Sequence, residues 1–247
     1  MANKFYSEGE QRAEKVNDLF ARIAPRYDLI NDLQSFGLHR AWKRRLVRMA
    51  GARPGERALD VCCGTGDIAF ALARAGARVA AIDFSDAMLA VARERAERAP
   101  CSHLDVQFRQ GDAQRLPFAG NTFEIVTVGY GLRNLPDWSG GLREMFRVTK
   151  PGGRLLVLDF GKPDTSLWRA VYFGYLRWFV PVFGRLFCGD SATHAYILES
   201  LKIYPAQRGV AGKMRELGCR DVRIVNLVGG AMSINYGIRP PRPSKMA

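Results

Sequence analysis

The stretch Asp60-Val61-Cys62-Cys63-Gly64-Thr65-Gly66-Asp67 joins the first short apolar run of the chain to the first helical segment after it. Glycines at such a junction let the backbone approach a ligand closely, and the start of the helix offers unpaired N–H groups. This glycine-bearing turn therefore predicts a ligand site at the end of a strand, and we expect Gly64 and Gly66 to contact the ligand.

Short apolar runs alternate with helical segments on the C-terminal side of this turn. Strands are predicted at 57–63, 78–83, 106–109, 123–129 and 154–160, and helices at 67–75, 86–99 and 140–149. This alternation is typical of a doubly wound α/β fold, whose mostly parallel sheet is covered on both faces and binds ligands at the carboxyl ends of its strands. A helix at 206–217 and strands at 222–227 and 231–236 predict an antiparallel edge that completes seven strands.

The length of 247 residues suits one α/β domain with added segments better than two independent domains. We divide the chain into a helical cap (1–50), a ligand-binding core (51–164), a helical insertion after strand five (165–204) and a C-terminal part that completes the sheet (205–247). In the cap, a helical segment at 10–33 is interrupted at Pro25, and a second helix follows at 38–50.

Composition and charge indicate the partners and the cellular location to expect for the protein. The net charge of +13 favours anionic partners such as nucleic acid, lipid headgroups or acidic ligands, although a high arginine content that only maintains solubility explains it equally well. The segment 1–17 lacks the apolar stretch of a signal peptide, and no apolar run has the length of a membrane span. We therefore expect a cytoplasmic protein.

The cysteines and histidines predict neither disulfides nor a metal site. The number of cysteines is odd and no Cys-x-x-Cys pair occurs, so all are expected to be reduced thiols: Cys62, Cys63, Cys101, Cys188 and Cys219. Cys62 and Cys63 are placed on the first strand, with their side chains on opposite faces. His39, His103 and His194 are scattered along the chain.

Charge around the glycine-bearing turn separates two classes of cofactor. Gly64-x-Gly66-x-x-Ala69 also fits the dinucleotide fingerprint, but a dinucleotide carries an anionic pyrophosphate. Asp60 and Asp67 would repel that group, whereas they would attract the ammonium and sulfonium groups of S-adenosylmethionine. Asp67 also suits the start of a helix on its own account. The predicted cofactor is therefore S-adenosylmethionine.

Two further loops point to the same nucleoside. Asp83 ends the second predicted strand, near the offset of an acid that binds ribose hydroxyls, with a simple turn residue as the alternative. Asp112 and Ala113 follow the third strand, where the carboxylate can accept a hydrogen bond from an adenine amino group and backbone N–H groups can meet ring nitrogens. A plain Gly-Asp turn is the alternative there. Together the three loops are more specific than any one alone.

From about Val16 to Gly237 the chain resembles the ubiquinone/menaquinone biosynthesis C-methyltransferase family. The motifs that carry the resemblance are Ala24-Pro25-Arg26-Tyr27-Asp28 with Asn31-Asp32, His39-Arg40-x-Trp42-Lys43, the glycine-bearing turn, Leu116-Pro117-Phe118, Gly131-Leu132-Arg133-Asn134, Lys150-Pro151-Gly152-Gly153-Arg154 and Leu158-Asp159-Phe160. The resemblance implies a Rossmann-like class I methyltransferase fold. It also implies methyl transfer to a ring carbon of a prenylated benzoquinol or naphthoquinol.

The resemblance also implies cofactor contacts at Thr65, Asp83, Asp112 and Ala113. Gly129 is also expected among the cofactor-binding residues, although the family often has serine at this position and glycine offers no side-chain contact. The double cysteine before Gly64 resembles the menaquinone branch of the family more than the ubiquinone branch.

Carbon methylation needs an electron-rich ring, which the loss of a proton from a quinol hydroxyl supplies. Arg133 and Asn134 follow the fourth predicted strand, and we expect them to hold the quinol oxygen. Arginine rarely loses its own proton, so Arg133 is expected to stabilise the phenolate or to organise a water that takes the proton. Asp159, at the end of the fifth strand, is another candidate proton acceptor.

The N-terminal cap offers further candidates. Tyr27, Asp28 and His39 are expected to reach over the site from this cap. For Tyr27 and His39 the alternative is packing with satisfied hydrogen bonds.

The inserted segment 167–187 suits an apolar tail and a membrane surface. Its aromatic residues, interleaved with Arg169, Arg177 and Arg185, are Trp168, Tyr172, Phe173, Tyr175, Trp178, Phe179, Phe183 and Phe187. Apolar stems beside cationic heads are typical of membrane interfaces, so peripheral contact with an anionic inner membrane face is expected. An ordinary lid that packs on the core is the alternative.

Three other functions compete with quinol methylation. A nucleic-acid methyltransferase commonly carries Asn/Asp-Pro-Pro-aromatic after the fourth strand, whereas the loop here is Gly129-Tyr130-Gly131-Leu132-Arg133-Asn134, so no nucleic-acid partner is expected. A protein that holds the methyl donor without chemistry is a second class. A methyltransferase of another lipid or polyketide-like molecule is the nearest alternative. The sequence leaves a homo-oligomer open.

Overall fold

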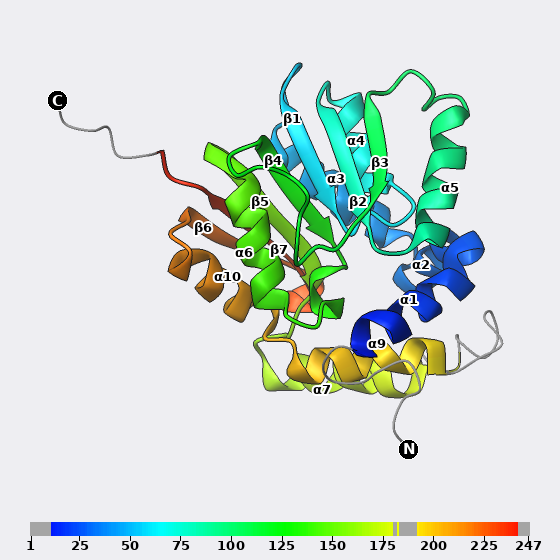
Figure 1. Ribbon diagram of the computed structural model, residues 1–247. Coiled ribbons are helices and arrows are strands. Elements are labelled where there is room, and N and C mark those ends of the chain that lie inside the picture. The colour runs from blue at the N-terminus through cyan, green and yellow to red at the C-terminus, as the bar shows by residue number, and fades with distance from the viewer. Residues whose placement is uncertain (1–10, 180–181, 183–191, 242–247) are drawn as a thin grey trace.

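The computed structural model describes residues 11–179, 182 and 192–241, which contain one seven-stranded sheet (Figure 1). The strands are β1 (Arg57–Val61), β2 (Arg78–Asp83), β3 (Val106–Gln110), β4 (Phe123–Gly129), β5 (Thr149–Phe160), β6 (Arg220–Leu227) and β7 (Met232–Ile238). Their order is β3-β2-β1-β4-β5-β7-β6. The pairs among β1 to β5 are parallel, and β7 is antiparallel to both β5 and β6. The predicted doubly wound sheet with an antiparallel edge is thus confirmed.

The helices fall into two groups. The first covers the faces of the sheet and comprises α3 (Leu38–Ala50), α4 (Asp67–Arg74), α5 (Asp86–Glu97), α6 (Trp138–Val148) and α10 (Ala206–Glu216). The second gathers across one end of the sheet and comprises α1 (Gln11–Ile23), the 3₁₀ turn η1 (Ala24–Arg26), α2 (Tyr27–Ser35), α7 (Ser166–Gly174), the π-helical turn η3 (Tyr175–Phe179) and α9 (Ala192–Ile203) (Figure 1). Phe183, Arg185, Phe187 and Cys188 lie outside the described residues.

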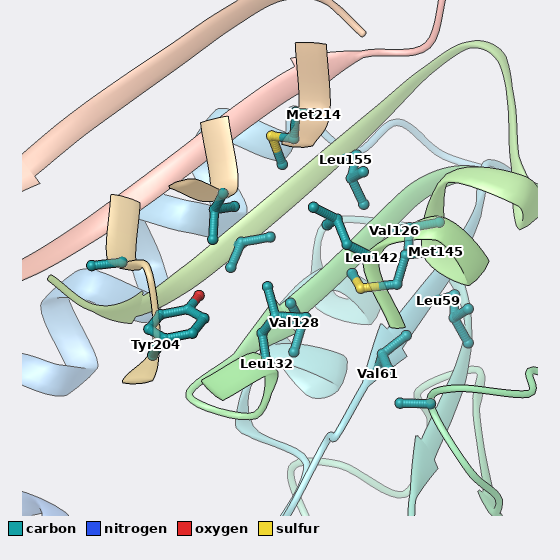
Figure 2. Close-up of a cluster of buried hydrophobic side chains, with 14 of the residues drawn as sticks. Leu59, Val61, Val126, Val128, Leu132, Leu142, Met145, Leu155, Tyr204 and Met214 are labelled. Carbon is teal, nitrogen blue, oxygen red and sulfur yellow. The ribbon is translucent and has the colours of Figure 1, made fainter. Parts of the chain in front are cut away.

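Successive strand residues divide the core between the two faces of the sheet. Leu59, Val126 and Leu155 share one cluster with residues of α6 and α10 (Figure 2). Their neighbours Ala58, Ile125 and Leu156 belong to the cluster that includes α3 and α4. Because side chains alternate along a strand and both faces are covered, the central strands are mostly apolar and buried along most of their length. This double coverage accounts for the short apolar runs in the sequence.

The chain reverses its direction of travel across the sheet between β1 and β4, which are neighbours. Such a switch point leaves a crevice outside the carboxyl ends of the strands. β1 leads into the glycine-bearing turn, and β4 leads into the 3₁₀ turn η2 (Leu132–Asn134), which contacts α1 and α9. The N-terminal cap and the insertion therefore lie at the ligand-binding end of the sheet.

The placement of Cys62 and Cys63 on the first strand is wrong, because β1 ends at Val61. Cys62 has a φ of +54°, so the turn begins at this residue. A β-carbon at Gly131 would lie only 2.3 Å from that of Cys62. The loop after β4 therefore packs directly on the turn, and glycine at 131 makes this close approach possible.

Several other boundaries also differ from the sequence prediction, and the structure gives the reason for two of them. α6 begins at Trp138 rather than Gly140, because the Asp137 carboxylate accepts a hydrogen bond from the backbone N–H of Gly140 at 2.8 Å and caps the helix. β5 begins at Thr149 rather than Arg154, because the Pro-Gly-Gly segment continues the strand through a shift in register against β4.

Arg239 provides a test of how the C-terminal edge is fixed. Its Nη1 donates to the carbonyl oxygens of Phe146, Arg147 and Thr149 at 2.8, 2.9 and 2.6 Å. Arg239→Ala should lower the free energy of unfolding by about 2 kcal/mol, because the end of α6 loses a charged donor. Urea denaturation measures the change. The exposed Arg223→Ala on β6 is the control, and equal effects of the two variants would contradict this role.

Candidate active site

Three cavities adjoin at the carboxyl ends of the strands. The strand-end cavity has walls that include Gly64, Asp83, Asp112, Ala113, Gly129 and Asn134. The polar pocket has walls that include Lys43, Asp60, Thr65 and Asp67. The apolar cavity is lined by the cap, by α7 and by Arg133 of η2. Tyr27 and Tyr130 line all three cavities, so ligands in neighbouring cavities would meet beside these two rings.

Asp83 both fixes the glycine-bearing turn and faces the strand-end cavity. Its Oδ2 accepts from the backbone N–H of Gly64 at 2.8 Å, and its Oδ1 accepts from that of Ser85 at 2.9 Å. Burial raises the pKa of Asp83, and these hydrogen bonds oppose the rise. A carboxylate accepts about four hydrogen bonds, so acceptor capacity remains for ligand hydroxyls.

The loops after β3 and β4 form another wall of the strand-end cavity. Asp112 accepts from the backbone N–H of Gln114 at 2.8 Å, and Ala113 is buried beside it. At Gly129 a β-carbon would lie 2.5 Å from Cδ1 of Ile68. The wall at Gly129 therefore consists of backbone, and a serine at this position would require Ile68 to move.

Asp60 is the carboxylate that lacks a full set of partners. It is 1% exposed, and its Oδ1 accepts from the hydroxyl of Thr127 at 2.8 Å. Oδ2 is buried without a hydrogen-bond partner among the described residues. Burial raises the pKa of Asp60 to about 7. Because Asp60 lines the polar pocket, a cationic group bound there would supply the missing partner.

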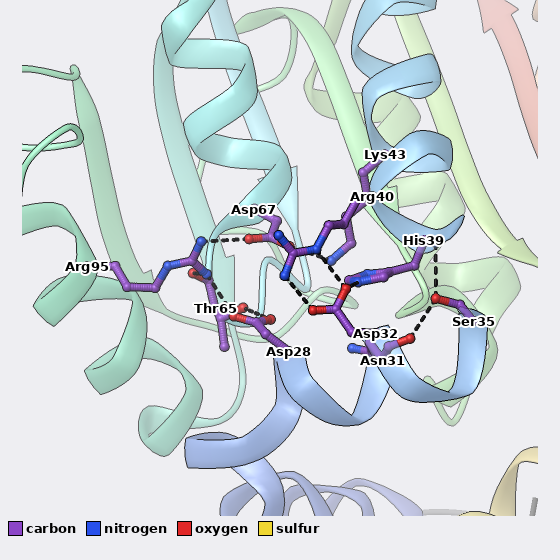
Figure 3. A network of polar contacts seen from close by, with 10 residues as sticks. All are labelled: Asp28, Asn31, Asp32, Ser35, His39, Arg40, Lys43, Thr65, Asp67 and Arg95. Atoms are coloured by element: carbon purple, nitrogen blue, oxygen red, sulfur yellow. Dashed lines mark hydrogen bonds and ion pairs between the residues drawn. The ribbon is translucent and has the colours of Figure 1, made fainter. Parts of the chain in front are cut away.

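Asp67 differs from Asp60 because two cations already compensate its charge. Lys43 Nζ lies 2.8 Å from Oδ2, and Arg95 Nη2 lies 2.7 Å from Oδ1 (Figure 3). Burial opposes ionisation of Asp67, but Lys43 and Arg95 outweigh it and hold its pKa well below the usual range. The attraction for a cation that the sequence assigned to both aspartates therefore falls on Asp60.

Asp28 and Gly66 line none of the three cavities. Asp28 accepts from the hydroxyl of Thr65 at 2.9 Å and pairs with Arg95 at 3.1 Å (Figure 3). Gly66 precedes α4 with a φ of +88°, and a β-carbon there would lie 2.9 Å from the rings of Phe108 and Phe70. Asp28 and Gly66 therefore stabilise the turn without lining one of the three cavities.

Arg133 is a buried cation at the wall of the apolar cavity. It is 4% exposed, and its Nε lies 3.4 Å from Oδ1 of Asp159. Its Nη1 donates to Asn134 Oδ1 at 2.7 Å and to Ser200 Oγ at 3.0 Å. Burial raises the pKa of Asp159 to about 6, and the charge of Arg133 opposes the rise. Arg133 faces the apolar cavity and Asn134 the strand-end cavity, so this pair spans their boundary.

The cap contributes His39 and Tyr27 to the apolar cavity. His39 is 3% exposed and its Nε2 lies 2.8 Å from Oδ1 of Asp32. Sequence reasoning gave no role to Lys43 or Tyr130, although both line the polar pocket. The spacing of four residues from His39 to Lys43, which places both on one helix face, was the available signal for Lys43.

Comparison with known proteins gives a consistent result. Residues 8–239 match the family described as the ubiE/COQ5 methyltransferase family. The ubiquinone/menaquinone biosynthesis C-methyltransferase UbiE of Ectopseudomonas mendocina (strain ymp) is 42% identical over 233 residues, which cover 93% of this chain and 91% of the relative. The demethylmenaquinone methyltransferase of Desulfitobacterium hafniense (strain Y51) is 38% identical over 235 residues, with 94% and 92% covered.

Solved structures share the fold at low identity. A SAM-dependent methyltransferase from Thermotoga maritima matches with a TM-score of 0.63 and 18% identity, covering 90% of this chain and 99% of that one. A SAM-dependent methyltransferase from Aquifex aeolicus matches with a TM-score of 0.58 and 19% identity, covering 85% and 93%. These matches confirm the class I methyltransferase fold.

The raised pKa of Asp60 predicts how stability depends on pH without ligand. Unfolded, this carboxyl ionises near 3.8, whereas in the fold it holds its proton to about 7. The native state binds more protons between these values, so the free energy of unfolding falls as the pH rises through this window. The Asp60→Asn variant has no titrating group at this position. As the pH rises from about 5 to about 8, its free energy of unfolding should therefore increase by about 2 kcal/mol relative to that of wild type.

Chemical denaturation of the ligand-free protein at both pH values measures the effect. Asp105→Asn is the matched control, because Asp105 is 60% exposed on the surface. An Asp60→Asn variant with the same pH dependence as wild type would show that the buried carboxyl is ionised throughout.

Proposed function

The chain belongs to the ubiE/COQ5 methyltransferase family, and we propose that it transfers the methyl group of S-adenosylmethionine to a ring carbon of a prenylated quinol. One observation carries this proposal: a carboxylate-lined cavity and a large apolar cavity adjoin each other at Tyr27 and Tyr130. A charged nucleoside suits the first cavity and an apolar ring with its tail suits the second. The two reactants would then meet at the boundary.

The residues at the strand ends fit S-adenosylmethionine. In the polar pocket, the unpartnered oxygen of Asp60 suits the ammonium of the donor, and Lys43 suits its carboxylate. In the strand-end cavity, Asp83 would accept from the ribose hydroxyls, and Asp112 would accept from the adenine amino group. When bound, this cofactor supplies an electrophilic methyl group.

The apolar cavity fits a ring that carries a long hydrocarbon tail. Its walls are predominantly apolar, with contributions from Ile30, Trp42, Phe160 and Leu176. Such walls bury a ring and an isoprenoid chain without leaving polar groups unpaired. The relatives bear names from both the ubiquinone and the menaquinone routes, so the shared substrate class is a prenylated quinol.

Arg133 is the group that would stabilise the developing negative charge on the ring oxygen. It is buried, it lines the apolar cavity, and Asp159, Asn134 and Ser200 fix its guanidinium. A donor that is already oriented in a dry site stabilises charge more strongly than water does. Tyr27 and Tyr130 shape the boundary at which the ring carbon must face the methyl group.

We further propose that the enzyme takes its substrate from an anionic membrane surface. Among the described residues, no helix is both long and apolar enough to span a bilayer. Leu167 and Val171 are 78 and 51% exposed and lie one turn apart on α7, and Trp178 on η3 is 71% exposed. Phe36, 77% exposed, lines the same apolar cavity as Val171. These four exposed side chains form an apolar rim, which would reach into the lipid at the entrance of the cavity.

The direct test of the function is an anaerobic reaction of the purified protein with S-adenosylmethionine and a demethylated prenylated quinol. Mass spectrometry should show a product that is one methylene unit heavier, with the new methyl on a ring carbon. Methylation on oxygen, or of an unrelated lipid in preference to the quinol, would overturn the proposal.

Arg133→Lys tests the role in charge stabilisation while keeping a cation beside Asp159. The lysine cannot reproduce the guanidinium fork, so kcat should fall by about 100-fold or more while the Kd for S-adenosylmethionine stays within about threefold. Steady-state kinetics and calorimetry measure the two values. The exposed Arg143→Lys on α6 is the control. A parallel loss of kcat and cofactor binding would reject this assignment.

Leu167→Ser combined with Trp178→Ser tests the apolar rim. Loss of two exposed apolar side chains should reduce the fraction of protein bound to phosphatidylglycerol vesicles about tenfold. Vesicle sedimentation at low salt measures binding, with phosphatidylcholine vesicles as the control for charge. If wild type fails to sediment with anionic vesicles, no membrane contact takes place.

A further inference from the structure

His39 occupies an unusual position for a histidine with a purely structural role. It lies in the first turn of α3, is 3% exposed and lines the apolar cavity. Its Nε2 lies 2.8 Å from Oδ1 of Asp32, and Arg40 holds the same carboxylate from the exposed side (Figure 3). His39 therefore contacts the Asp32 carboxylate and also contributes to the wall of the cavity proposed for the substrate.

The hydrogen bond to Asp32 decides which ring nitrogen carries the proton. The hydrogen bond from Arg40 holds the pKa of Asp32 at about 2, so this carboxylate is ionised and can only accept. Nε2 of His39 must therefore be the donor. Burial lowers the pKa of His39, and the charge of Lys43 lowers it further, so the ring is neutral at pH 7. In a neutral ring with its proton on Nε2, the lone pair is on Nδ1.

That lone pair has no partner within the part of the chain that the structure describes. Nδ1 of His39 is buried and accepts no hydrogen bond from any described residue. Leaving a buried acceptor unsatisfied in a predominantly apolar cavity has a free-energy cost. A ligand that brings a hydroxyl into the cavity would remove this cost. In the apolar cavity, the hydroxyl-bearing ligand that the proposed function supplies is the quinol, because the ribose hydroxyls of the cofactor are assigned to Asp83 in the strand-end cavity.

The position of His39 relative to the cofactor follows from its helix. Lys43 lies one turn further along α3, and its Nζ is 5.8 Å from the centre of the Tyr130 ring. Tyr130 lines both the apolar cavity and the strand-end cavity. His39 thus contributes to the apolar cavity near the boundary with the cofactor. The charged groups that act on it are Asp32 on α2, Lys43 on α3 and Asp67 on α4.

On the basis of the proposed function, we propose that His39 is the general base of the reaction. Its Nδ1 accepts the proton of the ring hydroxyl next to the carbon that is methylated, and Asp32 keeps the imidazole in the required tautomer. Arg133, on η2, then stabilises the oxygen that has lost its proton. The base and the charge-stabilising cation are thus two residues from two elements.

The proton and electron balance is complete without an added reactant. The oxygen–hydrogen bond electrons move toward the ring as Nδ1 takes the proton, and the ring carbon forms a bond to the methyl carbon. The methyl–sulfur bond breaks, and its electron pair stays on sulfur. The methylated carbon then loses its hydrogen as a proton to water, and the imidazolium returns its proton to the ring oxygen. The overall reaction gives the methylated quinol and S-adenosylhomocysteine and releases one proton to solution.

His39→Gln is the variant that isolates the base, because the amide nitrogen of glutamine can still donate to Asp32 while no basic nitrogen remains. The methyl-transfer rate at pH 7 should fall about 100-fold or more, with unchanged binding of S-adenosylmethionine. Wild-type activity should fall as the pH drops through the pKa of His39, because the protonated ring cannot accept a proton. The variant should lack this limb, and its rate should rise with pH as the quinol ionises in solution.

Two further measurements separate a base from a packing residue. Added imidazole should raise the methyl-transfer rate of His39→Ala at least about tenfold. A residue with a purely structural role would show no such rescue. Asp32→Asn can donate to Nε2 and so move the proton to Nδ1, and it should lose activity as His39→Gln does. The exposed Arg44→Gln on α3 is the control for changes to this helix.

The outcomes distinguish this inference from the proposed function. If wild type methylates the quinol and His39→Gln keeps more than about a third of the rate with the same pH profile, His39 is not the base. Absence of imidazole rescue, in a His39→Ala protein that melts normally and binds cofactor, would overturn the inference as well. If wild type itself leaves the quinol unmethylated, it is the proposed function that fails.

Discussion

One electrostatic constraint organises the site: three carboxylates lie at or near the carboxyl ends of adjacent parallel strands, and the fold leaves one of them short of partners. Asp83 and Asp112 accept backbone hydrogen bonds, whereas Oδ2 of Asp60 is buried with no hydrogen-bond partner among the residues that the structure describes. In a chain with a net charge of +13, this local excess of acceptors is a property of the strand ends rather than of the composition. It selects a ligand that brings cationic groups and hydroxyls, and disfavours a pyrophosphate.

The helices around the strand ends separate polar from apolar ligands. Lys43 and Arg95 neutralise Asp67 and hold the helical cap against the glycine-bearing turn, with Asp28 and Thr65 in the same network (Figure 3). Beyond that network the wall becomes apolar, and Tyr27 and Tyr130 mark the change. The same cap thus forms part of the wall of both the cofactor site and the substrate site. This accounts for the position of α1 and α2, which precede the α/β core in the chain yet lie at its ligand-binding end.

The strands and the cofactor loops were accessible from sequence because local rules determine them. Alternating apolar runs predicted the sheet, and the residues at its strand ends, Gly64, Asp83 and Asp112, line one cavity as expected. The ion pairs were not accessible, because Asp67 meets Arg95 across a sequence separation of 28 residues. The orphaned nitrogen of His39 was also hidden, since it depends on the relative placement of α2 and α3. Cys62 was misplaced because the sharp turn depends on contact with a distant glycine at 131.

Calorimetric titration of the purified protein with S-adenosylmethionine and, separately, with NAD⁺ tests the central electrostatic claim most directly. We expect saturable binding of the sulfonium nucleoside and no measurable heat of binding for the dinucleotide under the same conditions. Tight binding of NAD⁺ with none of S-adenosylmethionine would show that the carboxylates at the strand ends do not select a cationic ligand.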